Sequence, residues 1–163
     1  KRGLIKEEHA AVMIAQMSTL NKVGELLGKI PGVSAMTDVT GFGILGHLVE
    51  MAEGAGLSAD IVYSQLPVTE GAREYLAQRI VPDATFRNWN SYSTKVGFEK
   101  GVNVMEAFSL LPDPQTNGGL LFSANETSLP EIKKLLEENG LKNFINPIGR
   151  FTAQKEKIIN VKL

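Results

Sequence analysis

The sequence predicts an α+β protein, a layered α/β sandwich in which helices pack on a mixed sheet. Segments with a helical apolar period and short apolar strands are mixed along the chain without strict alternation, which is typical of this class. The length of 163 residues favours one domain, residues 1–163, that buries about 70% of its extended surface. The sequence contains no internal repeat and no low-complexity segment.

The first third of the chain is predicted to form two helices with a strand between them. A helical period covers residues 7–28, where Met13 and Met17 are expected to fill the core and Gly28 ends the helix. An apolar strand is predicted at residues 33–39. The second helix, residues 43–55, places four apolar side chains on one face: Leu45, Leu48, Val49 and Ala52.

The middle of the chain has weaker signals. Residues 58–63 read as a strand, and Thr69 is a candidate N-cap for a third helix. Residues 80–109 show no regular period, and a run of that length without structure is either functional or wrongly assigned. The side chains expected to face inward from the third helix are Ala72, Tyr75 and Leu76.

The last third of the chain predicts a strand, a helix and two closing strands. Residues 120–124 form a short apolar strand. Ser128 and Glu131 have the spacing of a capping box, which starts a helix that Gly140 ends. The two closing strands are predicted at residues 144–149 and 157–162.

Composition and charge exclude several classes of function. The net charge of −1 gives no global attraction to nucleic acid or an anionic membrane, and no apolar run approaches the ~20 residues that span a bilayer. The absence of cysteine excludes disulfides, thiolate metal sites and cysteine nucleophiles. The two histidines, His9 and His47, are expected to pack rather than to bind a ligand. We expect a cytoplasmic protein, and a fragment of a longer chain because Lys1 is not methionine.

The segment at residues 36–46, MTDVTGFGILG, carries the strongest chemical signal. Asp38 and two threonines, Thr37 and Thr40, lead directly into glycines that open a helix. Glycines let the backbone approach a bulky anion, and the amides at a helix start favour negative charge. Mg2+ is usually held by one or two carboxylates together with phosphate oxygens. The segment therefore predicts part of a phosphate-handling site.

The glycines at residues 41–46 also match the G-x-G-x-x-G dinucleotide fingerprint. That motif needs an acid at the carboxyl end of the next strand, whereas Asp60 would lie at the start of that strand. Asp38 also puts a charge in the first strand, which is normally apolar in a parallel sheet. We therefore set the dinucleotide interpretation aside, and a tight turn without a ligand remains the alternative for the glycines alone.

A second motif, LPDPQTNGGLL, covers residues 111–121. Asp113 followed by proline starts a turn, Thr116 and Asn117 add hydrogen-bond donors, and Gly118 and Gly119 permit a close backbone approach. Taken alone, this motif is a surface turn that leads into a strand.

Together, the two motifs closely resemble the carboxyl-terminal half of the selenophosphate synthetase (selenide, water dikinase) family. Residues 85–92 resemble that family's segment between the motifs, and the resemblance covers nearly the whole chain. Aminoimidazole ribonucleotide synthetase and a hydrogenase maturation factor share the architecture, including the type of carboxyl-terminal domain, but not this pair of motifs. One departure is Asn117, which stands where the family is expected to have serine.

The resemblance implies that the full-length protein makes selenophosphate from selenide and ATP and releases AMP and phosphate. It implies a homodimer of two-domain subunits, with Mg2+ as the metal and with no nucleic acid or membrane partner. Most ATP ligands, several metal-binding aspartates, and a reactive cysteine or selenocysteine with a lysine would belong to an amino-terminal domain that these residues do not include. The present chain is expected to fold but to be inactive by itself.

The resemblance also assigns roles to individual residues. Asp38 matches the metal-coordinating aspartate of this half, which would complete a Mg2+ shell over the ATP phosphates. Thr37, Thr40 and Gly41 are expected to shape that shell. The second motif is expected to build a neighbouring wall from Asp113, Thr116, Asn117, Gly118 and Gly119.

Two questions stay open at the level of sequence. Arg87 and Asn88 are candidates to contact an anion, with an ion pair as an equal alternative for Arg87. Two other functions also compete with the leading one: an ATP-dependent ligase of the same superfamily acting on a nucleotide-like substrate, and a non-catalytic dimerisation or binding module.

Overall fold

A computed structural model of the protein describes residues 3–163 and confirms the α+β class. The strands are β1 (Val33–Asp38), β2 (Ser58–Val62), β3 (Val96–Phe98), β4 (Leu120–Ala124), β5 (Gly149–Thr152) and β6 (Ile159–Lys162). The α-helices are α1 (Glu7–Ser18), α2 (Val23–Leu27), α3 (Gly43–Gly54), α4 (Ala72–Ala77), α5 (Asp83–Tyr92), α6 (Val104–Leu110) and α7 (Leu129–Glu138).

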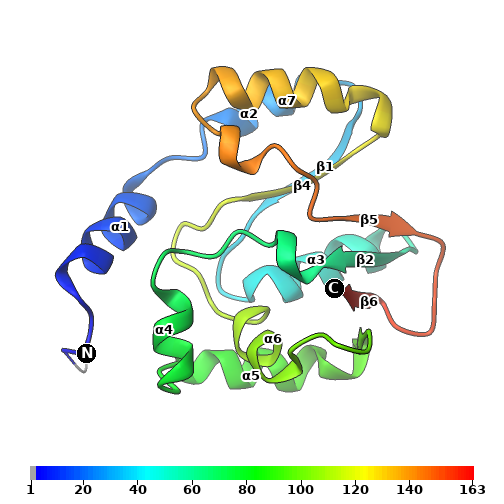
Figure 1. The fold of residues 1–163 in the computed structure, drawn as a ribbon. Helices are drawn as coiled ribbons and strands as arrows, with labels where there is room; N and C mark the ends of the chain where they lie inside the picture. Colours follow the sequence, from blue (N-terminus) through cyan, green and yellow to red (C-terminus); the bar gives the residue numbers. More distant parts are fainter. Residues whose placement is uncertain (1–2) are drawn as a thin grey trace.

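The strands form two separate sheets (Figure 1). β1 and β4 make an antiparallel two-stranded ribbon, and the other strands make a four-stranded sheet in the order β3-β6-β2-β5. In that sheet β6 runs parallel to both β2 and β3, whereas β5 is antiparallel to β2. The predicted mixed sheet is therefore confirmed, although β1 and β4 do not belong to it.

The main core forms between α3 and the four-stranded sheet. The apolar face predicted for this helix is confirmed, because all four of its residues are buried. Strands β2 and β6 contribute Ile61, Ile159 and Val161 to the same cluster. This packing fixes α3, and with it the loop that joins the end of β1 to the start of the helix.

A second core lies between the ribbon and the helices α2 and α7 (Figure 1). It is built around Leu27, Ile132 and Leu136, all of which are buried. Strand β4 contributes to both cores, because Leu121 packs in the main core while its neighbours Leu120 and Phe122 pack against the second. The ribbon is thus a layer between two cores.

The predicted helix over residues 7–28 is wrong as a single element, because the chain leaves the helix at Thr19 and starts α2 at Val23. The amide of Asn117, far along the chain, donates to the carbonyl oxygens of Met17 and Thr19, both at 2.8 Å. These carbonyls at the end of α1 have no later helical turn to bond them, so Asn117 satisfies acceptors that would otherwise be orphaned.

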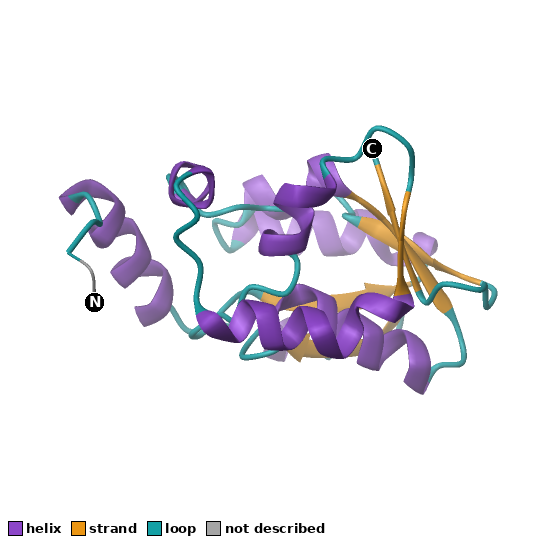
Figure 2. Cartoon of the chain, turned by 90° about the horizontal axis from the view of Figure 1, so that it is seen from below, coloured by secondary structure: helices purple, strands orange, loops and turns teal. Residues whose placement is uncertain are grey.

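Helix α1 projects from the body of the protein (Figures 1 and 2). Ile14 is 56% exposed and Met13 is 39% exposed, so the expectation that Met13 fills the core is wrong. The helix contacts α4 through His9, whose Nδ1 lies 2.8 Å from the hydroxyl of Tyr75. Much of the apolar face predicted for this helix is therefore exposed within residues 3–163.

Two predicted helix caps are wrong. The hydroxyl of Thr69 bonds the side chain of Gln16, and Gly71 is the residue that precedes α4. Ser128 already has helical backbone angles and makes no side-chain cap, so the expected capping box does not form. The side chain of Asn125, which has extended backbone angles, instead accepts from the amide of Ser128.

Residues 80–109 contain regular elements, so wrong assignment, one of the two alternatives for this run, is confirmed. They form α5, β3 and α6, and α5 starts directly after Pro82, a residue that cannot donate a backbone hydrogen bond. Trp89 of this helix packs against Phe98 and Phe108, with ring centroids 6.1 and 5.0 Å away. Because most residues of α5 are polar, its apolar stripe is not evident from the sequence.

The closing strands also differ from the prediction. The strand expected at residues 144–149 is wrong, since Lys142–Phe144 is a 3-10 turn and β5 starts only at Gly149. Pro147, which has no N–H to donate, lies two residues before the start of β5. The last predicted strand is confirmed as β6, although it begins two residues later. No helix among residues 3–163 is both long and apolar enough to cross a membrane.

Candidate functional site

The structure brings the two sequence motifs together, backbone to backbone. Asp38 is the last residue of β1 and stands opposite Leu120 in β4, with its side chain exposed. Beyond it, the amide of Val39 donates to the carbonyl of Gly119 at 2.9 Å, and the amide of Gly118 returns the bond to Val39 at 3.1 Å. Asp38 thus lies at the end of a fixed ribbon, directly before the junction of the motifs.

The junction continues through the next residue. The carbonyl of Thr40 accepts from the amide of Gln115 at 3.0 Å and from the amide of Gly43 at 3.0 Å. Thr37 and Thr40 are partly buried, whereas Gly41 is exposed. The predicted residues of the first motif therefore share one loop with Asp38, and this loop is tied to the second motif at successive positions.

Two glycines are explained by close packing between the motifs. Gly43 has a positive φ of 66°, and a Cβ placed on it would lie 2.6 Å from the backbone carbon of Pro112. A Cβ on Gly118 would collide with the carbonyl oxygen of Val39. At these positions the close neighbour is the other motif itself, so the turn needs glycine whether or not a ligand is bound.

Asn88 on α5 joins the two motifs from the side. Its buried amide nitrogen donates to the carbonyl oxygen of Gly41 at 2.8 Å and to that of Pro112 at 2.9 Å. Because both amide protons are used in this way, Asn88 acts as a clamp within the protein, and the expectation that it contacts an anion is wrong. Arg87, its neighbour, is exposed and makes no ion pair within residues 3–163.

Asp113 is held inside the second motif. One carboxylate oxygen accepts from the hydroxyl of Thr85 at 3.1 Å, and the other accepts from the side-chain amide nitrogen of Gln115 at 2.9 Å. Burial raises the pKa of the Asp113 carboxyl, and these two hydrogen bonds oppose that effect. Asp113 also borders a cavity of about 170 Å³ between α4 and α6. Its carboxylate anchors the turn, and no contact links it to Asp38.

The remaining residues of the second motif divide into two groups. Thr116 and Gly119 are exposed, next to the end of β1. Asn117 has a left-handed backbone, with φ of 50°, and uses both amide protons to bind the end of α1. A serine hydroxyl has only one proton, so asparagine at this position gives the chain a second hydrogen bond.

His47 is a residue whose contacts the sequence did not reveal. It is buried on the first turns of α3, and its Nε2 lies 3.2 Å from both the amide nitrogen and the hydroxyl oxygen of Thr40. Its Nδ1 lies 3.3 Å from a carboxylate oxygen of Glu50. The spacing of seven residues between Thr40 and His47 was the available signal, because it returns a helical side chain to the loop that precedes the helix.

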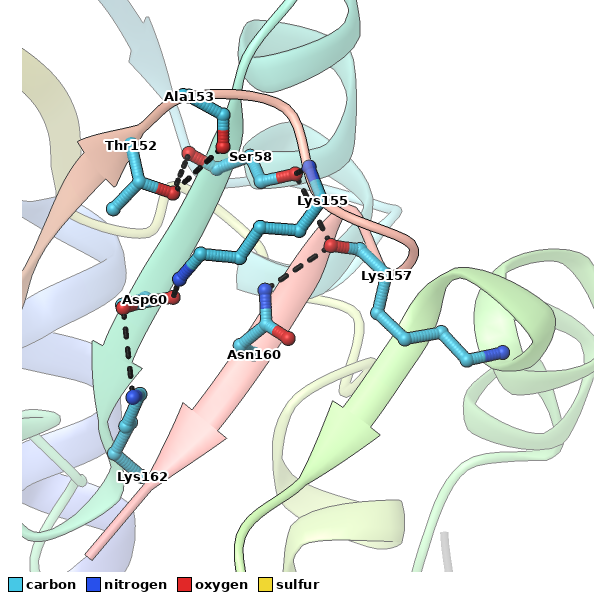
Figure 3. A network of polar contacts seen from close by, with 8 residues as sticks. All are labelled: Ser58, Asp60, Thr152, Ala153, Lys155, Lys157, Asn160 and Lys162. Atoms are coloured by element: carbon cyan, nitrogen blue, oxygen red, sulfur yellow. Dashed lines mark hydrogen bonds and ion pairs between the residues drawn. The ribbon is translucent and has the colours of Figure 1, made fainter.

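Asp60, the acid weighed for the dinucleotide motif, has a different environment (Figure 3). It lies on β2 in the four-stranded sheet, with the ammonium of Lys155 2.5 Å and that of Lys162 3.6 Å from its carboxylate oxygens. Burial favours a higher pKa for Asp60, but the hydrogen bond and charge of Lys155, with those of Lys162, lower it below its usual value. Since β1 belongs to the other sheet, the structure excludes the dinucleotide interpretation.

The donor set around Asp38 suits a hard cation only in part. A carboxylate oxygen is the type of ligand that Mg2+ prefers, and the hydroxyls of Thr37 and Thr40 lie in the adjoining residues. However, residues 3–163 contain no cluster of three or more acidic, histidine or cysteine side chains that could hold a metal. Among the described residues, Asp38 thus offers a single carboxylate beside these two hydroxyls.

Comparison with known proteins gives one family and a consistent set of relatives. The family of AIR synthase related proteins, C-terminal domain, matches residues 1–162. A selenide, water dikinase of Aeromonas salmonicida is 41% identical over 155 residues, covering 94% of this chain and 43% of the relative. The corresponding enzymes of Bordetella bronchiseptica and Haemophilus influenzae are 41% and 37% identical, covering 99% and 100% of this chain and 45% of each relative. The chain thus spans less than half the length of these relatives.

Proposed function

From the premise that this chain belongs to the family of AIR synthase related proteins, C-terminal domain, we propose that it is the carboxyl-terminal domain of a selenide, water dikinase. The full-length enzyme makes selenophosphate from selenide and ATP and releases AMP and phosphate. The observation that carries the proposal is the junction of the two motifs, which presents the exposed Asp38 at the end of a fixed ribbon.

Asp38 supplies one metal ligand to the ATP site. Its strand is fixed by β4, and the following residue is bonded to the second motif, so the carboxylate has a defined direction. Thr37, Thr40 and Gly41 shape the metal shell, and the second motif forms the wall beside it with Asp113, Thr116, Asn117, Gly118 and Gly119. Mg2+ bound there would offset the negative charge that develops on the transferred phosphoryl group.

The other parts of the site come from outside the chain. The absence of a metal cluster within residues 3–163 supports a shared site, completed by an amino-terminal domain of the same protein. The exposed apolar side chains of α1, including Ile14, support a covering surface from that domain or from a second subunit. The protein is a cytoplasmic homodimer that takes selenide and ATP, and the chain alone is inactive.

Phosphorus NMR of the full-length protein with Mg-ATP and selenide, without oxygen, tests this function. Wild type should form selenophosphate and AMP. In Asp38→Asn, which keeps the shape but removes the charge, the rate should fall about 100-fold or more, because a lost metal ligand costs several kcal/mol and about 1.4 kcal/mol is a factor of ten.

The matched control is Asp83→Asn, since Asp83 is exposed at the start of α5 and should leave the rate unchanged. Formation of ADP without selenophosphate would favour the ligase of the same superfamily. Full activity of Asp38→Asn would refute the role of Asp38, and absence of turnover in wild type would favour a non-catalytic module.

A further inference from the structure

We propose that His47 is a positioning residue for the Asp38 loop, acting as a neutral imidazole that carries its proton on Nδ1 and accepts the backbone amide of Thr40 on Nε2. The inference rests on the proposed function for its catalytic consequence, since it names what fixes the loop that carries the metal ligand. The contacts of His47 itself lie within residues 40–50.

The backbone amide of Thr40 is bonded differently from that of its neighbour Val39. The neighbouring amide of Val39 bonds the second motif, but the amide of Thr40 has no backbone acceptor within residues 3–163. Its partner is Nε2 of His47, 3.2 Å away, and Thr40 is partly buried. An amide in such a place needs an acceptor, because a buried donor without one is costly. His47 therefore supplies a bond that the backbone fold does not.

The contact with Thr40 also determines which nitrogen of the neutral imidazole carries the proton. A backbone N–H can only donate, so Nε2 must offer its lone pair, and in a neutral ring the proton is then on Nδ1. Nδ1 lies 3.3 Å from a carboxylate oxygen of Glu50, whose negative charge favours a proton on that nitrogen. The hydroxyl of Thr40, also 3.2 Å from Nε2, shares the same lone pair. The amide of Thr40 thus sets the tautomer, and the ring holds Thr40.

The contact between His47 and Thr40 helps to hold the loop that follows Asp38. Four contacts fix the loop after β1: Val39 to the second motif, Thr40 to Gln115, Gly41 to Asn88 and Thr40 to His47. The contact of His47 is the one that comes from α3, the helix packed in the main core. It therefore couples the position of the loop to the core of the domain. Groups that hold a metal-bearing segment in this indirect way typically change metal affinity or activity 10–100-fold when removed.

Two substitutions separate positioning from simple packing. In His47→Gln the side-chain oxygen reaches about as far as Nε2 and can accept the amide of Thr40. In His47→Asn the side chain is one methylene shorter and reaches only the place of Nδ1. A packing role predicts the same defect in both variants, because both remove the ring, whereas a positioning role predicts rescue by Gln.

The experiment uses the full-length protein and begins without Mg2+ or ATP. Nitrogen-15 NMR of labelled histidine, with His47→Gln to assign the signal, should show Nδ1 protonated and Nε2 unprotonated at neutral pH. Hydrogen exchange at the amide of Thr40 should be about tenfold faster in His47→Asn than in wild type, as expected for one lost hydrogen bond, and close to wild type in His47→Gln. The Mg2+ concentration for half-maximal product formation should rise 10–100-fold in His47→Asn and recover in His47→Gln.

A proton on Nε2, unchanged exchange at Thr40 in a folded His47→Asn variant, or equal defects in both variants would overturn the inference. The outcomes also separate it from the proposed function. If wild type forms no selenophosphate, the function fails, while the proton position and the exchange at Thr40 still decide what His47 does. If Asp38→Asn is inactive but His47→Asn keeps the wild-type dependence on Mg2+, the function stands and the role of His47 is refuted.

Discussion

Replacing Asn88 by alanine should destabilise the chain by about 1.5–4 kcal/mol. The substitution removes the two hydrogen bonds that Asn88 donates to the carbonyl oxygens of Gly41 and Pro112. The carbonyl of Pro112 is buried and loses its partner, which costs ~1–3 kcal/mol, whereas the carbonyl of Gly41 lies near the surface and can bond water, so its loss costs about 0.5–1 kcal/mol.

Urea unfolding of the 163-residue chain, followed by circular dichroism, measures this difference. Asn90→Ala is the matched control, because Asn90 is exposed on the same helix and should change the free energy of unfolding by no more than about 0.5 kcal/mol. Asn88→Asp should be worse than alanine at neutral pH, since it places acceptors against two carbonyls. Equal stability of Asn88→Ala and Asn90→Ala would refute the clamp.

Two further predictions concern Gly43 at the start of α3 and the ion pair of Asp60 in the four-stranded sheet. Gly43→Ala should cost at least about 2 kcal/mol in thermal or urea unfolding, because φ is 66° and the new Cβ would meet the backbone of Pro112; Gly54→Ala, with open space around it, is the control and should not destabilise. If both glycine variants behaved alike, the close packing would not be the reason for Gly43. The lowered pKa of Asp60 contributes stability that is present above the ordinary aspartate pKa of about 3.9 and is lost as pH falls through the lower pKa of the folded state. Urea midpoints measured from pH 6 to pH 2 should therefore fall less in Asp60→Asn than in wild type, and parallel curves would contradict the ion pair with Lys155.

Burial patterns were the part of the fold that the sequence predicted best. The period of α3 was correct because Leu45, Leu48, Val49 and Ala52 all pack in the main core. The period of α1 was equally clear, yet Ile14 and Leu20 are exposed, at 56% and 69%. An apolar period predicts a buried face, but it does not show which segment would cover that face.

Local sequence patterns mispredicted helix ends where a side chain elsewhere in the chain forms the hydrogen bond at that end. The capping box predicted at Ser128 does not form. Asn125, three residues earlier, has the extended backbone angles of a cap, and its side chain accepts from the amide of Ser128. The break after α1 coincides with hydrogen bonds from Asn117, about 100 positions away along the chain. Helix α5 was missed because its exposed face is strongly polar, and its apolar residues are spread among aromatic contacts with β3 and α6.

The motifs of the candidate site were visible in the sequence, but the contacts between them were not. Spacing and composition singled out Asp38 and the glycines, and the family resemblance linked them to the segment at Asp113. Neither could show that Asn88 joins both motifs or that His47 accepts the amide of Thr40, because these bonds depend on where helices of different segments meet. The binding roles of the site residues remain predictions that the experiments above address.

The position of β4 between two cores also protects the strand pairing against error. Leu121 faces one core while Leu120 and Phe122 face the other, so a shift of β4 by one residue would turn the wrong side chains toward both cores at once. Strand β4 of this ribbon therefore has side chains packed on both of its faces. The register that sets Asp38 opposite Leu120 is therefore favoured by both cores, because a shifted β4 would pack badly in each of them.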